Sequence, residues 1–179
     1  VTLTALDPGT YWICVQAQDA KNGTRNANNH GLEIVIAEDL YWVGNGSNWN
    51  NTSNWSLASG DASAGVVPAS TQNVVFDTGS PGSCTVDTDV AVKNFTVTSD
   101  YSSTIDNSGK PDFTLTGDVS VDSAVTWTKG TGTITLSGTT AQSVSIGESV
   151  EDIVMDKSGG TVSLGASLEA ESLALSSGA

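Results

Sequence analysis

The chain has little positive charge. Of its 179 residues, six are Lys or Arg and 20 are Asp or Glu, which gives a formal net charge of −14. A surface of this sign repels nucleic-acid phosphates and anionic lipid headgroups. No apolar run reaches the ~20 residues that a membrane-spanning helix needs. The composition therefore predicts neither a nucleic-acid partner nor membrane insertion.

Cysteine and histidine are also scarce. The two cysteines, Cys14 and Cys84, lie far apart in the sequence and form no C-x-x-C pair, and His30 is the only histidine. These counts exclude a His-based metal cluster and the usual zinc spacings. We predict two small buried thiols and a solvated histidine in a polar loop.

Proline and charged residues are few, whereas small polar residues are abundant. The chain has four prolines and 19 glycines, 15% charged and 37% hydrophobic residues. This mixture is too apolar for a disordered chain and is typical of a β-protein with many short strands and turns. We therefore expect an all-β fold.

The first forty residues predict three strands, at residues 1–6, 11–20 and 32–36, with a turn at 7–9 and a polar loop at 21–30. The stretch LDPGTYWICVQAQDAKNG resembles the last half of a bacterial immunoglobulin-like or fibronectin type III-like domain. The resemblance implies that residues 1–39 are the C-terminal strands of an incomplete antiparallel β-sandwich. Its earlier strands are expected before Val1.

Residues 41–56, YWVGNGSNWNNTSNWS, hold three tryptophans and five asparagines. The pattern continues through a Val-Pro turn at 67–68 to VVFD at 74–77. It resembles a β-helix surface module of bacterial adhesin-like proteins and of structural proteins of environmental bacteriophages. The resemblance implies that a parallel β-helix follows the tryptophans.

A strand motif recurs through the second half of the chain and supports the same fold independently. Its copies follow one another at spacings of 18, 21, 19 and 20 residues and start at Phe95, Phe113, Ile134, Ile153 and Leu173. A period near twenty predicts solenoid coils of three short strands. An antiparallel sandwich is the alternative, but few two-residue hairpin signals separate the strands.

One coil can be predicted strand by strand, at residues 113–116, 119–121 and 125–128. The residues expected to point inward are Phe113, Leu115, Val119, Val121, Val125 and Trp127. We predict a right-handed parallel β-helix over residues 40–179, continuing beyond Ala179. Because a solenoid exposes its ends, the tryptophan-rich stretch is expected to be its N-terminal cap.

Two kinds of ligand site were weighed. Asp87-Thr88-Asp89 offers oxygens that suit Ca²⁺, although a solvated turn explains the same residues. Trp42, Trp49 and Trp55, with Asn48 and Asn54, could stack on and hydrogen-bond a sugar, but burial of the rings in the cap is favoured because three tryptophans in water would be costly. The other aspartates fall at predicted turns, so no catalytic residue, metal site or cofactor is assigned.

The expected function is that of a non-enzymatic structural or adhesive protein. The chain would be a fragment of a long modular fibre or decoration, located outside the cell, on the cell surface or on a virion. Expected partners are other structural subunits, surface glycans or further copies of the chain. The alternative is a carbohydrate-binding module, or part of a carbohydrate-active β-helix enzyme.

Overall fold

The computed structural model describes residues 9–13, 17–19, 23–25, 32–36, 38–109 and 111–177. The chain divides into two compact units, Val1–Glu38 and Asp39–Ala179. Almost all regular structure is β-strand. Within the described ranges the only helix is the short 3₁₀ turn η1 (Thr52–Asn54).

The first unit contains two antiparallel pairs. Strand β1 (Gly9–Ile13) pairs with β4 (Leu32–Ile36), and β2 (Ala17–Asp19) pairs with β3 (Gly23–Arg25). The prediction of a strand at 32–36 is confirmed. The predicted 21–30 loop was wrong at its start, because β3 pairs back on β2 there. Cys14, His30 and the predicted strand at 1–6 lie outside the described residues.

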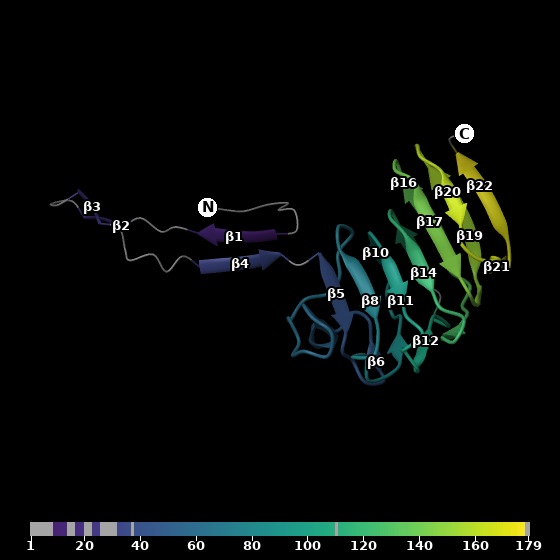
Figure 1. Cartoon of the computed structure of the whole chain (residues 1–179), viewed down its shortest axis with the longest axis horizontal. Helices are drawn as coiled ribbons and strands as arrows, with labels where there is room; N and C mark the ends of the chain where they lie inside the picture. The colour runs from purple at the N-terminus through teal and green to yellow at the C-terminus, as the bar shows by residue number, and fades with distance from the viewer. Residues whose placement is uncertain are drawn as a thin grey trace. The chain divides into compact units, whose positions relative to one another are not determined.

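The second unit is a parallel β-solenoid, whose coils follow one another from blue β5 to yellow β22 in Figure 1. On its first face successive coils contribute parallel strands. These strands are β5 (Asp39–Trp42), β8 (Asn73–Phe76), β11 (Phe95–Val97), β14 (Val119–Val121), β17 (Gln142–Ile146) and β20 (Val162–Leu164). The edge of β5 is closed by the antiparallel strand β7 (Trp55–Ser56).

Two further faces complete each coil. The second face is β10 (Val90–Val92), β13 (Phe113–Leu115), β16 (Thr133–Gly138), β19 (Asp152–Lys157) and β22 (Leu173–Ser177). The third face is β6 (Ser47–Asn48), β9 (Cys84–Thr85), β12 (Thr104–Asp106) and β15 (Thr126–Thr128). It is interrupted after β15, and β18 (Ser149–Val150) and β21 (Glu169–Ala170) form a separate pair.

The parallel pairing confirms the predicted β-helix, and the antiparallel sandwich is wrong for this unit. Residues Phe113, Ile134, Ile153 and Leu173 lie in register in one column, as the repeat predicted. Phe95 does not belong to that column, since it pairs with Val74 and Val119 on the first face. Strands β11 and β13 are similar in sequence but lie on different faces, so the spacing between Phe95 and Phe113 is not a coil length.

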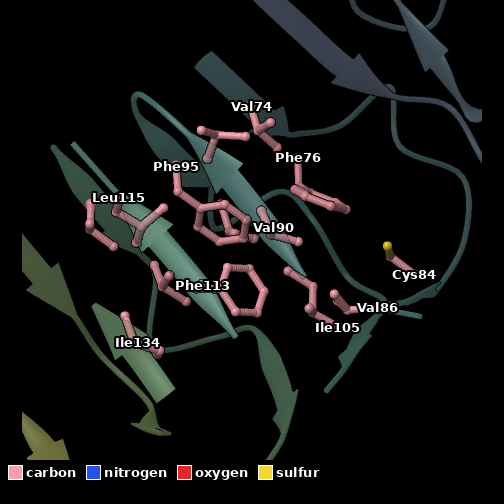
Figure 2. Close-up of a cluster of buried hydrophobic side chains, with 14 of the residues drawn as sticks. Val74, Phe76, Cys84, Val86, Val90, Phe95, Ile105, Phe113, Leu115 and Ile134 are labelled. Carbon is pink, nitrogen blue, oxygen red and sulfur yellow. The ribbon is translucent and has the colours of Figure 1, made fainter. Parts of the chain in front are cut away.

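The coil that the sequence predicted strand by strand is also present. Its strands are β13, β14 and β15, and five of the six residues expected to point inward are buried. The sixth, Trp127, is partly exposed and packs against the core. Figure 2 shows how inward side chains such as Phe95, Phe113 and Leu115 gather between the faces. Each such buried side chain contributes about 1.5–3 kcal/mol.

No helix in the described part of the chain is long and apolar enough to cross a membrane.

Candidate functional site

The tryptophan-rich stretch folds over the first coil. Trp42 ends β5 and lies opposite Trp55 in the antiparallel pair β5–β7. Between them η1 reverses the chain, and its N-cap Asn51 accepts a hydrogen bond from Ser53 N at 3.0 Å. Asparagine suits this position because its side-chain oxygen satisfies a free N–H at the helix start. The reversal places Trp55 across the end of the sheet.

The three indole rings form one packed cluster. Ring centroids are 5.2 Å apart for Trp42–Trp55 and 4.6 Å for Trp49–Trp55, both edge-to-face. The cluster continues into the core through Phe76, 5.7 Å from Trp42, and Phe95, 6.4 Å from Trp49. Aromatic pairs in such geometry add about 0.5–1.5 kcal/mol beyond the burial of their area. The cap is therefore continuous with the core.

Backbone carbonyl groups accept hydrogen bonds from the buried indole nitrogens of Trp42 and Trp55. Trp42 Nε1 donates to Gly82 O at 2.9 Å, and Trp55 Nε1 donates to Trp49 O at 2.8 Å. Gly44 leaves room for the Trp42 ring, since a Cβ at this position would clash with Trp42 Cζ2. The glycine of the YWVG motif is thus required by packing.

The three tryptophans and Asn54 are not available for sugar contact. Trp42, Trp49 and Trp55 are 0%, 1% and 0% exposed, so no ring face is free to stack on a sugar. Asn54 is also buried, and its Nδ2 donates to Asn48 O at 2.8 Å. Asn48 alone is exposed. The tryptophans instead form the cap, which was the other interpretation of the same sequence.

The two aspartates of the candidate calcium motif have structural roles. Asp87 Oδ1 accepts a hydrogen bond from Asn50 N, and Asp89 Oδ1 accepts one from Asp112 N, both at 3.0 Å. Each bond links one coil to its neighbour. Within the described residues, no group of three or more His, Cys, Asp or Glu side chains could hold a metal ion.

Other aspartates divide into two kinds. Asp106 and Asp122 accept hydrogen bonds from backbone N–H groups two residues ahead, as the predicted Asx turns require. Asp112 and Asp118 accept bonds from Thr133 N and Ser143 N, which lie on the next coil. The sequence placed most of the aspartates at turns but did not show which ones join coils.

A ladder of amide side chains along one corner of the first face was missed in the sequence. Asn73 Nδ2 donates to Asp39 Oδ1 at 2.7 Å, and Asn94 Nδ2 donates to Asn73 Oδ1 at 2.8 Å. Asn94 Oδ1 in turn accepts from Asp118 N at 2.6 Å. The ladder fixes the register of four successive coils. Its signal in the sequence was an Asn or Asp immediately before the first inward residue of each of these first-face strands.

A carboxylate lies inside the solenoid where the third face is interrupted. Glu151 is 1% exposed, and its Oε1 accepts hydrogen bonds from Asn107 Nδ2 at 2.7 Å and from Gly130 N at 2.8 Å. Its Oε2 accepts one from Trp127 Nε1 at 3.0 Å. Glu151 thereby joins three coils across the gap between β15 and β18. No local sequence signal marks it, since its partners are 21 to 44 residues away.

A second interior polar cluster occupies the corner between β16 and β17. Lys157 Nζ donates to Gln142 Oε1 at 2.6 Å and to Ser137 O at 3.4 Å. Gln142 Nε2 donates to Leu115 O at 3.1 Å and to Gly117 O at 2.7 Å. Burial lowers the pKa of Lys157 below its ordinary value. The sequence did not reveal this cluster either.

Cys84 and Tyr101 are buried beneath the cap. Burial raises the pKa of the Cys84 thiol well above its ordinary value of 9.0, and the negative charges of Asp87 and Asp106 raise it further. Burial likewise raises the pKa of Tyr101, whose hydroxyl donates to Gly82 O and Thr104 O. The thiol is free and fully buried, which confirms the prediction for Cys84 and leaves it unreactive.

The fold and these clusters define a capped parallel β-solenoid. Comparison with family models, with curated proteins and with solved structures finds no match for the chain. Functional inference therefore rests on the architecture and on the side chains described above.

Proposed function

We propose that the chain is a non-enzymatic structural and adhesive segment of a long modular surface protein, displayed outside the cell or on a virion. The observation that carries the proposal is the stack of in-register parallel strands over one hydrophobic core, closed at one end by buried tryptophans. Such a stack gives an extended, regular scaffold. The resemblance of residues 41–77 to β-helix surface modules supports the same role.

The side chains at the corners favour a scaffold that resists distortion. Backbone hydrogen bonds on the faces join each coil to its neighbours, and the amide ladder adds further bonds at the corner. Glu151 bridges the one interruption. In this proposal the immunoglobulin-like strands before residue 40 act as a spacer, and the acidic surface keeps the protein soluble at high density.

Adhesive contacts would be made by the outer faces. Outward positions on the first face carry small hydroxyl side chains in register at Thr96, Ser120 and Ser145, and Ser143 pairs with Ser163 in the same way. Such groups can hydrogen-bond surface glycans or neighbouring structural subunits. The aspartates of the turns serve coil-to-coil bonds, which favours a binding scaffold over a hydrolase.

Surface labelling tests the proposal. Antibodies raised against the purified full chain would be applied to intact source cells and to virus particles from the same culture, followed by electron microscopy. We expect gold label on the unpermeabilised surface, abolished when the antibody is pre-absorbed with the chain. Label that appears only after permeabilisation would overturn the proposed location.

A second assay separates scaffold from enzyme. The full chain would be incubated with a panel of acidic and neutral polysaccharides, and new reducing ends would be measured over time. We expect no release above a heat-denatured control. Release that disappears on removal of a particular carboxylate would support the carbohydrate-active alternative instead.

A further inference from the structure

The contact between Lys157 and Gln142 places a nucleophile against an amide inside the solenoid. Lys157 is 6% exposed and Gln142 is 2% exposed. The Nζ atom is 2.6 Å from Oε1. Since the amide carbon is one C=O bond, about 1.23 Å, from that oxygen, Nζ lies no more than about 3.8 Å from Cδ. This upper bound exceeds the about 3–3.5 Å of a near-attack geometry by only about 0.3 Å.

The surroundings of the pair favour reaction at the amide carbon. Burial lowers the pKa of Lys157, which enlarges the neutral fraction of the amine, the form that can attack. The amide nitrogen of Gln142 is held by Leu115 O and Gly117 O, so the carbonyl stays turned toward the amine. The same two oxygens can accept hydrogen bonds from a departing ammonia molecule. Water has little access to compete with the amine.

We propose that Lys157 and Gln142 form an intramolecular isopeptide bond. The lone pair of neutral Nζ attacks Gln142 Cδ, and a new Nζ–Cδ bond forms while the Cδ–Nε2 bond breaks. One Nζ proton passes to the leaving nitrogen, which departs as ammonia. No oxidant, reductant or co-reactant is needed, because the reaction exchanges one amide for another.

The bond would join the start of β17 on the first face to the end of β19 on the second. It would close residues 142–157, the fifth coil of the solenoid, into a covalent ring. A closed coil cannot be drawn out lengthwise, which suits a scaffold under tension. The chemistry of the bond does not depend on where the protein is located, so the surface role can fail while this inference holds.

Mass spectrometry of the purified full chain tests the inference. The denatured protein, fresh and after prolonged incubation of the folded chain at mildly alkaline pH, should be lighter than its sequence mass by one ammonia. Trypsin should fail to cleave after Lys157, and a branched peptide containing Gln142 and Lys157 should appear. Lys157→Met and Gln142→Leu should each restore the full mass, whereas Lys129→Met should keep the deficit.

Lys129 is the matched control because its amine is exposed and lies 3.0 Å from Glu171 Oε1 instead of an amide. Should a core variant fail to fold, the unmodified chain still decides the question. Full sequence mass after incubation, with tryptic cleavage at Lys157 equal to that at Lys129, would overturn the inference. An ammonia loss mapped to Asn45–Gly46, where a succinimide can form, would overturn it as well.

Discussion

Within residues 39–177, the capped first coil and the last coil leave inward side chains in different environments. At the cap, Trp42, Trp49 and Trp55 cover the first coil and are at most 1% exposed. In the last coil, Leu164, Leu173 and Leu175 continue columns of inward residues that are buried in earlier coils, and they are 53%, 55% and 80% exposed. Burial therefore depends on a residue's coil as much as on its type.

The difference predicts a gradient of stability along the axis. Near the cap a removed side chain leaves a cavity, with coils packed on both sides, whereas in the last coil it removes surface that already contacts water. The same substitution should therefore lower the free energy of unfolding more near the cap than in the last coil. Stability measurements on the cap, on the polar contacts between coils and on the last coil test this account, and the largest effect is expected at the cap.

Trp49→Ala should be the most damaging change. Trp49 contacts Trp55, Phe76, Phe95 and Phe113, so its removal opens the centre of the cap. We expect the free energy of unfolding to fall by about 4 kcal/mol, as for other large aromatic deletions in cores. Urea titration of the full chain, followed by circular dichroism, measures it. A loss under about 1 kcal/mol would show that the cap does not hold the core.

Glu151→Ala should be nearly as costly. It leaves Asn107 Nδ2, Gly130 N and Trp127 Nε1 without their acceptor, and we expect a loss of about 3 kcal/mol. The matched control is Glu171→Ala, which removes an exposed ion pair with Lys129 and should cost no more than about 1 kcal/mol. Equal effects of the two variants in the same urea titration would contradict the interior role of Glu151.

Alkaline pH should destabilise the capped end through Cys84. Its pKa is raised in the folded chain, so the unfolded chain ionises first, and stability falls as pH rises above the ordinary value of 9.0. The loss approaches about 1.4 kcal/mol per pH unit for one group. Urea titrations between pH 8 and pH 10 should show this slope, and Cys84→Ala should reduce it. If Cys84→Ala loses stability with pH as steeply as the unmodified chain, the pH dependence does not come from Cys84.

Asn94→Ala should have a smaller effect. It removes the bond to Asn73 Oδ1 and the acceptor for Asp118 N, both partly exposed, at a cost of about 1 kcal/mol. Asn50→Ala is the control, since only its backbone N–H is known to bond and its side chain is exposed. Differential scanning calorimetry should give a lower Tm for Asn94→Ala than for the control.

Leu175→Ala should have the smallest effect, within about 0.5 kcal/mol, because the side chain is 80% exposed. Leu136 occupies the same column through Met155 and is fully buried. Leu136→Ala should therefore cost about 2–5 kcal/mol. The two substitutions are chemically identical and differ only in the coil that carries them. Similar losses of unfolding free energy in urea titration would contradict the proposed gradient of stability.

The sequence predicted the parts of the fold that local pattern controls. Alternation identified the strands and the inward side of the 113–128 coil, and the density of tryptophan identified the cap. Phe95 was assigned to the wrong column because partner residues on the first face, Val74, Phe95, Val119, Val144 and Leu164, are unevenly spaced. As a result, two similar strands on different faces, β11 and β13, resemble successive copies of one repeat.

The interior polar clusters could not be predicted in the same way. Glu151 meets partners on two earlier coils, and Lys157 meets Gln142 only after the chain has turned a corner. These contacts depend on the register between coils. The register depends on the length of each coil, which varies with the size of its turns. A buried Lys or Glu is also improbable from its residue type alone, since burial needs compensating partners.

Hydrogen exchange of the folded full chain, resolved by peptide, tests the central claim most directly. Amides exchange through local opening, whose free energy reflects packing and pairing on both sides of a strand. The capped solenoid predicts the slowest exchange in β8, β11 and β13 and progressively faster exchange through β19 to β20 and β22. Uniform exchange across these strands, or the fastest exchange at Trp42, Trp49 and Trp55, would contradict it.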